Sequence, residues 1–290
     1  MEVRKAIIPL AGMGTRFLPL SKVVPKELWP LAGRPMIEKI IREAKESGIN
    51  QIIFVISPGN KKIIDYLKPS PKIEKNLKEK KREELLKEYK EFEQFVKSIS
   101  FSYVIQKNPQ GDGHAILQAA KEVKKEPVAC LFSDDIIESK TPCLAQLQKI
   151  FKTCQKPVLS LYPVSENRIP SYGIAGVEKI ANRYYKVKEI IEKPSAAEAP
   201  SNLALVGKYI LTPEVFEYLK KAKPNEKKEI ILADTLSKML RDGKMIYGHE
   251  IEGKWLECGD KKSWMKSNLY FSLKDPELGP EMESFLREIK

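Results

Sequence analysis

Short apolar runs separated by amphipathic segments dominate the first half of this chain. The runs at residues 51–56, 101–106 and 127–132 contain β-branched or aromatic residues and are too short for buried helices. They therefore predict buried strands. A similar run, from Ala6 to Ala11, leads directly into a loop that contains two glycines. We expect these runs to pair in one sheet.

The segment after that loop predicts a helix. Apolar residues recur at helical spacing from Ile37 to Ala44, and Gly48 follows where such a helix would end. Residues 3–56 are therefore expected to form one β-loop-α-β unit. Strands that alternate with helices in this way predict an α/β fold. Its mixed, mainly parallel sheet would be flanked by helices and would bind ligands at the carboxyl ends of the strands.

The pattern becomes strand-rich after residue 155. The expected strands lie at 157–164, 173–178, 185–192, 203–211 and 245–251, and helices are expected at about 213–222 and 228–242. No internal repeat or low-complexity segment divides the chain, so we expect a single domain over residues 1–290. Its parts would be a first half at 1–155, a strand-rich half at 156–259 and a helical tail at 260–290.

A charged segment interrupts the first half. Residues 72–97 carry nine Lys or Arg and seven Glu around a thin apolar line, which predicts an amphipathic helix or a pair of helices. The net charge of this segment is 9 − 7 = +2, so it does not account for the +12 of the chain. We expect a solvated helix laid over the sheet, and contact with a partner is the less favoured alternative.

The composition narrows the class of protein. Four cysteines lie far apart without a C-x-x-C pair, which argues against a zinc site and favours a cytoplasmic location. No run of about 18 apolar residues occurs, so no contact with a membrane is expected. The net charge of +12 suits an acidic partner. Because no nucleic-acid-binding motif is present, we expect that this partner is not a nucleic acid.

The glycine loop carries the first candidate chemistry. It reads Gly12-Met13-Gly14-Thr15-Arg16, and Pro25-Lys26 follows after eight intervening residues. Glycines bring backbone N–H groups close to a polyphosphate, and Arg16 and Lys26 supply cationic donors to the same anion. The loop is not a Walker loop because it lacks the Gly-Lys-Ser/Thr ending, and it lacks the third glycine of the Rossmann fingerprint.

The glycine loop and the Pro-Lys pair, at this spacing, resemble the signature of the sugar-1-phosphate nucleotidyltransferases. The compact Ala-Gly-x-Gly-Thr-Arg form and the charged helical insertion are similar to the uridylyltransferase group of that family. The resemblance covers essentially the whole chain and implies a Rossmann-like nucleotide-diphospho-sugar transferase fold, with a nucleotide-binding half followed by a sugar-binding half. It further implies transfer of the uridylyl group of UTP to glucose 1-phosphate, giving UDP-glucose and pyrophosphate, by a homo-oligomer (dimer or tetramer).

The third strand runs into a candidate base-recognition segment that contains Gln106 and Gly113. A glutamine side chain offers a donor and an acceptor that can read a pyrimidine edge, and small residues leave room for a flat base. Taken alone, Gln106 is more often a polar residue at a strand end. The resemblance implies these nucleotide-binding residues: Ala11, Gly12, Gly14, Thr15, Gln106 and Gly113.

Two carboxylates, Asp134 and Asp135, follow the next strand. Oxygen ligands at the carboxyl edge of a sheet suit Mg²⁺ bound together with substrate phosphates. Successive side chains on a strand point apart, so we expect only Asp134, by resemblance, to face the site, and Asp135 to occupy a turn or helix cap. The resemblance adds Glu257 as a second metal-facing residue. The family usually has Asp there, so direct metal binding by Glu257 stays open.

A Glu192-Lys193-Pro194 motif follows a strand of the second half. By resemblance, Glu192 accepts hydrogen bonds from sugar hydroxyls and Lys193 contacts the sugar phosphate, roles that suit an acceptor-only carboxylate and an ammonium. Gly173 and Val206 are expected to line the sugar.

The expected catalytic residues are Arg16, Lys26 and Lys193. The sugar phosphate is itself an anionic nucleophile, so no nucleophilic side chain is required. Two alternatives remain: the same fold with another pair of substrates, for example dTTP or a different sugar, and a non-catalytic sugar-nucleotide sensor.

Overall fold

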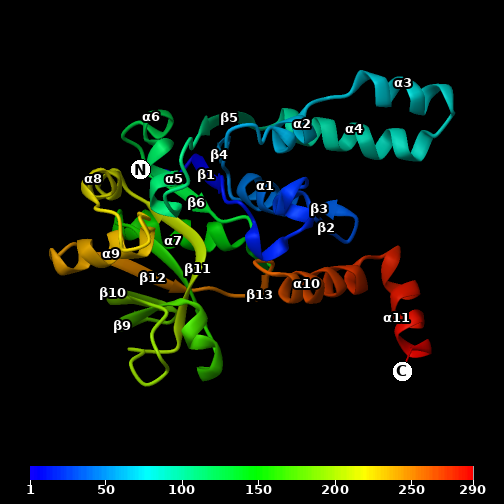
Figure 1. Ribbon diagram of the computed structural model, residues 1–290. Helices are drawn as coiled ribbons and strands as arrows, with labels where there is room; N and C mark the ends of the chain where they lie inside the picture. The colour runs from blue at the N-terminus through cyan, green and yellow to red at the C-terminus, as the bar shows by residue number, and fades with distance from the viewer. Residues whose placement is uncertain (290) are drawn as a thin grey trace.

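The computed structural model describes residues 1–289 and is built on one large sheet (Figure 1). The strands of this sheet are β1 (Lys5–Leu10), β4 (Gln51–Ile56), β5 (Ser100–Ile105), β6 (Val128–Leu131), β8 (Val158–Pro163), β9 (Gly173–Ala181), β10 (Tyr184–Glu192), β11 (Leu203–Leu211) and β12 (Ile246–Glu250). Their order is β5-β4-β1-β6-β11-β8-β12-β10-β9. The expected α/β fold with a mixed sheet is confirmed, and the apolar runs of the sequence form its strands.

Parallel and antiparallel pairing divide the sheet. The strands β5, β4, β1 and β6 pair in parallel, whereas β11 is antiparallel to both β6 and β8. In the second half only β12 and β8 are parallel, and β10 is antiparallel to both β12 and β9. The parallel character is therefore confined mainly to the first half of the chain, because its strands are joined through helices that return the chain to the same end of the sheet.

Helices cover both faces of the sheet. One face packs against α1 (Met36–Glu46) and α7 (Cys143–Cys154), and the other against α5 (Asp112–Gln118), α8 (Pro213–Lys221) and α9 (Leu232–Arg241). Successive side chains of β1 point to opposite faces of the sheet, so Ile8 packs in the apolar cluster of the first face and Ile7 in that of the second. Burial on both faces explains why every residue of β11 is buried.

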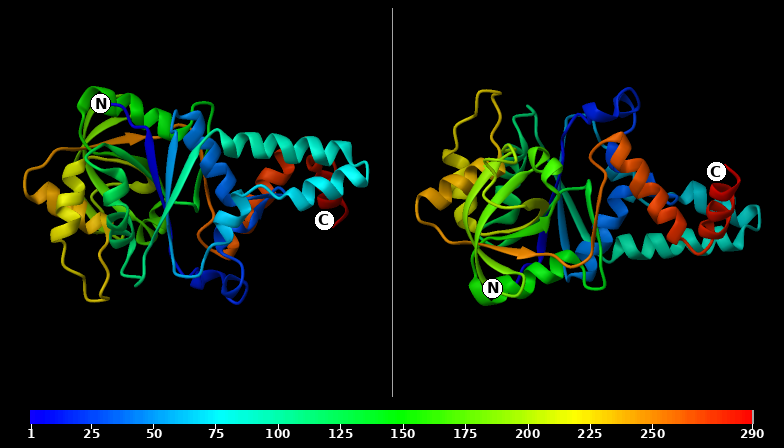
Figure 2. Two further views of the ribbon diagram at one scale, coloured as in Figure 1. Left: turned by 90° about the horizontal axis from the view of Figure 1, so that it is seen from above. Right: turned by 90° about the horizontal axis from the view of Figure 1, so that it is seen from below.

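The charged insertion forms a pair of helices, α3 (Pro71–Glu79) and α4 (Glu83–Lys97). Phe92, Phe95 and Val96 near the end of α4 pack against the apolar cluster of the first face. The rest of the pair extends past the edge of the sheet instead of lying over it (Figure 2). The tail forms a second projecting arm, with α10 (Lys261–Lys274) and α11 (Leu278–Glu288).

Several short elements were not expected from the sequence. The most consequential is a two-stranded antiparallel sheet of β7 (Asp135–Glu138) and β13 (Lys254–Glu257), which pairs Asp135 with Glu257. The others are β2 (Pro30–Leu31), β3 (Arg34–Pro35), α2 (Lys62–Leu67), α6 (Ala120–Val123), and the 3-10 helices at Thr15–Phe17, Leu20–Lys22, Lys26–Leu28 and Glu166–Ser171. Over residues 1–289, no helix combines the length and apolar composition that a membrane crossing requires.

A buried ion pair connects the central strand β11 to helix α1 on one face of the sheet. Nζ of Lys208, on β11, is 3.0 Å from Oε2 of Glu43 on α1, and the side chains are 0% and 9% exposed. The lysine forms no hydrogen bond of good geometry, so the attraction is mainly Coulombic. Oε1 of Glu43 accepts from the backbone N–H of Leu144 on α7 at 3.1 Å. One carboxylate therefore connects two helices to the middle of the sheet.

This arrangement predicts the stability of two variants. Lys208→Met should lower the free energy of unfolding by about 3–5 kcal/mol, because it leaves the Glu43 carboxylate buried without a counter-charge. The double variant with Glu43→Gln should regain part of that loss, since the amide oxygen still accepts from Leu144. Denaturant unfolding measures both, and Lys188→Met, at an exposed position, is the control. A single variant as stable as the control would contradict the prediction.

Candidate active site

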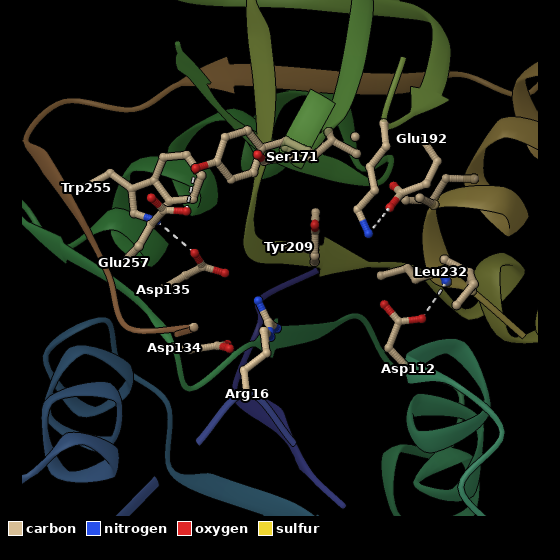
Figure 3. A pocket seen from close by; sticks show the side chains of 18 residues that line it. Arg16, Asp112, Asp134, Asp135, Ser171, Glu192, Tyr209, Leu232, Trp255 and Glu257 are labelled. Atoms are coloured by element: carbon tan, nitrogen blue, oxygen red, sulfur yellow. Dashed lines mark hydrogen bonds and ion pairs between the residues drawn. The ribbon is translucent and has the colours of Figure 1, made fainter. Parts of the chain in front are cut away.

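A cavity of about 340 Å³ lies between the two halves of the chain (Figure 3). Its walls come from both halves. Arg16 and Asp134 follow β1 and β6 along the chain, and the second half contributes the end of β10, the middle of β11 and the end of β13. Of the residues expected in the site, those that line it are Arg16, Asp134, Gly173, Glu192, Lys193 and Glu257. The structure thus gathers residues that are far apart in the sequence at one sheet edge, as expected for an α/β fold.

A second cavity, of about 580 Å³, lies along the glycine loop. Among the described residues that line it are three lysines, Lys22, Lys26 and Lys62, and no Asp or Glu. Gly12, Gly14 and Thr15 complete this wall. A Cβ at Gly12 would point into open space, whereas Gly14 has a φ of +61°, which favours glycine. The wall therefore offers backbone N–H groups and ammonium groups to an anion.

Lys26 and Asp134 join the two cavities. Nζ of Lys26 lies 2.5 Å from Oδ2 of Asp134, and both side chains are largely buried. Burial would lower the pKa of Lys26, but the charges of Asp134 and Glu27 raise that pKa above its ordinary value. Burial would likewise raise the pKa of Asp134, but the Lys26 charge and hydrogen bond hold it below its usual range. Both groups are therefore charged near neutral pH.

Asp135 also faces the cavity, so the expectation that it occupies a turn or helix cap is wrong. It begins β7, where its Oδ1 accepts from Nε1 of Trp255 at 2.7 Å and its Oδ2 from the backbone N–H of Gly207 at 3.1 Å. A Cβ at Gly207 would collide with this carboxylate and with Phe132. Burial, followed by the charge of Asp134, raises the pKa of Asp135. Two adjacent carboxylates therefore face the site instead of one.

Glu257 occupies the wall beside Trp255 (Figure 3). Its Oε1 accepts from the hydroxyl of Tyr172 at 2.6 Å, and its Oε2 pairs with the guanidinium of Arg168. Burial and the hydrogen bond to Glu257 raise the pKa of Tyr172. The glutamate, one methylene longer than the aspartate usual in the family, contacts Arg168 on the 3-10 helix Glu166–Ser171 and Tyr172 directly after it, and it lines the cavity.

Glu192 and Lys193 lie together at the end of β10. Gly173 pairs with Glu192 across the sheet, and a Cβ at Gly173 would lie 3.0 Å from Oε2 of Glu192. Lys193 is 61% exposed, and its Nζ lies 3.5 Å from Oε1 of Glu192. The structure does not place the fully buried side chain of Val206 in the cavity; its neighbour Leu205 lines the wall instead.

The groups of Gln106 and Gly113 that were expected to contact the base have hydrogen-bond partners within the protein. The Gln106 side chain is buried, and its Nε2 donates to the carbonyl of Gly111 at 3.2 Å and lies 2.8 Å from Nδ1 of His114. The N–H of Gly113 donates to the carbonyl of Ile230 at 2.9 Å, where a Cβ would be too close. Neither Gln106 nor Gly113 is among the residues that line the two cavities, and Ala11 is also buried.

Several residues of the site were missed by sequence reasoning. Asp112 lies inside the segment assigned to the base, and Trp255 lies two positions before Glu257 on the same face of β13. Strand alternation from Glu257 would have identified Trp255. Tyr209 lines the cavity two positions beyond the fully buried Gly207. No motif distinguishes Arg168, because its role depends on contact with a residue far along the chain.

The carboxylates suit a hard divalent cation. Among the described residues, no three Asp, Glu, His or Cys side chains form a ready-made metal cluster. Mg²⁺, however, commonly uses one or two protein carboxylates and takes its other ligands from water and substrate phosphates. Asp134 and Glu257 present carboxylate oxygens to the same cavity, so this donor set fits such an ion.

The comparisons with known proteins agree with this site. A family model described as nucleotidyl transferase matches residues 5–272. The UTP–glucose-1-phosphate uridylyltransferase of Staphylococcus haemolyticus (strain JCSC1435) is 37% identical over 289 residues, which cover 99% of each chain.

Two solved structures extend the agreement to the fold. A UTP-bound UGPase from Acinetobacter baumannii matches with a TM-score of 0.90 at 33% identity, covering 99% of this chain and 100% of that one. A UDP-glucose pyrophosphorylase complexed with UDP-glucose matches with a TM-score of 0.84 at 31% identity, covering 94% of this chain and 100% of that one. The expected Rossmann-like nucleotidyltransferase fold is confirmed, and the chain belongs to the nucleotidyl transferase family, among the UTP–glucose-1-phosphate uridylyltransferases.

Proposed function

We propose that the protein transfers the uridylyl group of UTP to glucose 1-phosphate and releases pyrophosphate. The observation that carries this proposal is the pair of adjoining cavities with opposite linings. One is lined by lysines and the glycine loop, and the other by carboxylates with Arg16 and Lys193 at its edge. The first suits a polyphosphate, and the second suits a sugar phosphate. The relatives bound to UTP and to UDP-glucose support this choice of substrates.

The residues of this chain position two anions and stabilise the charge that develops. An oxygen of the sugar phosphate attacks the α-phosphorus of UTP, and the bond from that phosphorus to the oxygen bridging to the β-phosphate breaks as pyrophosphate leaves. Lys193 would bind the sugar phosphate, and Glu192 would accept from sugar hydroxyls. Arg16, Lys26 and the glycine-loop N–H groups would stabilise the triphosphate and the leaving group.

Mg²⁺ would be held by Asp134, with Glu257 contributing directly or through a water molecule. When bound, it would neutralise part of the phosphate charge. The ion pair between Lys26 and Asp134 keeps the Asp134 carboxylate ionised and fixes its orientation.

A homo-oligomer in the cytoplasm is part of the same proposal. The two helices of the tail arm expose large apolar side chains, among them Met265, Leu269 and Phe285, and burial of such groups favours association. All four cysteines are free thiols, which suits a reducing compartment.

The substrate assignment predicts the outcome of a matrix of nucleoside triphosphates against sugar 1-phosphates, read by release of pyrophosphate. UTP with glucose 1-phosphate should turn over fastest, and EDTA should abolish the activity. Faster turnover with dTTP or with another sugar would replace the assignment. Binding of UDP-glucose without any turnover would favour a sensor, and full activity in EDTA would exclude the proposed ion.

Lys193→Ala should weaken the use of glucose 1-phosphate far more than the binding of UTP. The loss of a charge-assisted contact costs about 1.5–3 kcal/mol, or about ten- to a hundredfold in kcat/KM. Lys188→Ala is the matched control, because Lys188 is an exposed lysine on the same strand that pairs with Glu178. A larger effect on UTP than on the sugar phosphate would show that Lys193 serves the other anion.

Glu257→Ala should raise the Mg²⁺ concentration that gives half-maximal activity, because one carboxylate is lost from the cation-facing wall. Arg168→Ala is the comparison, since it removes the partner of Glu257 while the carboxylate remains. Titration of activity with Mg²⁺ measures both variants. If both variants shift the Mg²⁺ dependence equally, or if neither does, Glu257 has a structural role in the cavity wall and does not take part in binding Mg²⁺.

A further inference from the structure

Asp112 is a carboxylate on the cavity wall for which the proposed mechanism has no use. It lies at the start of α5, on the side of the cavity near Leu232, and its side chain is directed toward the space below Glu192 (Figure 3). Its Oδ1 accepts two backbone N–H groups, from Gly113 at 2.6 Å and from Leu232 at 3.0 Å. The bond from Leu232 connects the beginning of α5 to the beginning of α9.

The second oxygen of Asp112 has a different environment. No other group in residues 1–289 donates a hydrogen bond to Oδ2, and none of the ion pairs among these residues includes Asp112. Burial raises the pKa of Asp112 to about 6, so the group is mainly ionised at neutral pH. Asp112 is part-buried and lines the cavity. A ligand that displaces water from this wall must offer Oδ2 a donor, because an acceptor left without one is costly.

The chemistry of Asp112 limits what this ligand group can be. An ionised carboxylate only accepts hydrogen bonds, and it repels phosphate. Glu192 faces the same cavity and lies close enough for its charge to act on Asp112. Among residues 1–289, the cations of the cavity, Arg16 and Lys193, form no ion pair with Asp112, and Nζ of Lys193 lies 3.5 Å from Oε1 of Glu192 instead. The partner of Oδ2 is therefore an uncharged donor, and a hydroxyl on a sugar ring is the donor that both proposed substrates carry.

We propose that Oδ2 of Asp112 accepts a hydrogen bond from a sugar hydroxyl of a bound substrate and thereby contributes to specificity. The hydroxyl belongs to the hexose of the sugar phosphate or to the ribose of the nucleotide. This inference rests on the proposed function, because it assumes that both sugars enter this cavity. It gives the first residue of α5 a role in binding sugar hydroxyls in addition to its contact with α9.

The variant Asp112→Asn distinguishes the role of Oδ1 from that of Oδ2. The amide oxygen still accepts from Gly113 and Leu232, so the melting temperature should stay at the wild-type value, whereas the NH2 group that replaces Oδ2 cannot accept. We expect kcat/KM for the substrate in contact to fall about tenfold or more. Asp234→Asn is the matched control, because Asp234 is exposed and lies on the same helix as Leu232.

A series of deoxy substrates identifies the hydroxyl. One arm uses 2-, 3-, 4- and 6-deoxyglucose 1-phosphate with UTP, and the other uses 2′- and 3′-deoxyUTP with glucose 1-phosphate. For one of these hydroxyls, its removal should lower the kcat/KM of the wild-type protein about tenfold or more. Asp112→Asn should show the same kcat/KM with that deoxy substrate as with the parent substrate. Loss of discrimination in the first arm assigns the hexose, and in the second arm the ribose.

Two results would overturn the inference: deoxy penalties in Asp112→Asn that equal those of wild type for every hydroxyl, or a loss of activity that follows a lowered melting temperature. A wild-type protein without turnover would count against the proposed function alone. The comparison is then made by calorimetry, with the Kd of UDP-glucose and of its deoxy analogues for wild type and Asp112→Asn. Failure of wild type to bind UDP-glucose would overturn both.

Discussion

The buried contact between Lys208 and Glu43 determines how the two halves of the molecule meet. Strand β11 lies between β6 of the first half and β8 of the second, and its lysine is the one charge that this strand carries into the interior. An ammonium at that depth requires its carboxylate, so β11 cannot slide along its neighbours without separating the pair. This register places Gly207 where its N–H meets Asp135 and places Tyr209 on the wall of the cavity.

The separation of charge between the two cavities follows from this arrangement. Parallel strands of the first half deliver the glycine loop and its lysines to one side, and the second half delivers Glu192 and Glu257 to the other. Lys26 and Asp134 meet at the boundary, where each keeps the other ionised. A substrate pair that carries phosphates at its centre and sugars toward one side matches this distribution, because cations attract phosphates and carboxylates accept from hydroxyls.

Much of the fold was predictable because apolar periodicity marks buried strands and α1 directly. The site was less predictable for three physical reasons. Strand alternation was applied across Asp134 and Asp135, but the chain leaves β6 there and begins β7, so both carboxylates reach the cavity. Along β11, alternation places Val206 on the face of Lys208, toward α1, and leaves Leu205 for the cavity. In the segment expected to bind the base, the N–H groups of Gly113 and His114 donate to the carbonyl of Ile230, a contact that no local pattern reveals.

The small ladder of β7 and β13 has a consequence for the nascent chain. It pairs Asp135 with Glu257, and the intervening residues include most of the second half. During translation, Asp135 is made long before the strand that supplies Trp255, its indole donor. Closing such a long loop is slow compared with forming local contacts. The glycine loop and Lys26 can thus pack against Asp134 early, whereas the cavity wall that carries Trp255 and Glu257 is completed only when the carboxyl-terminal part of the chain has left the ribosome.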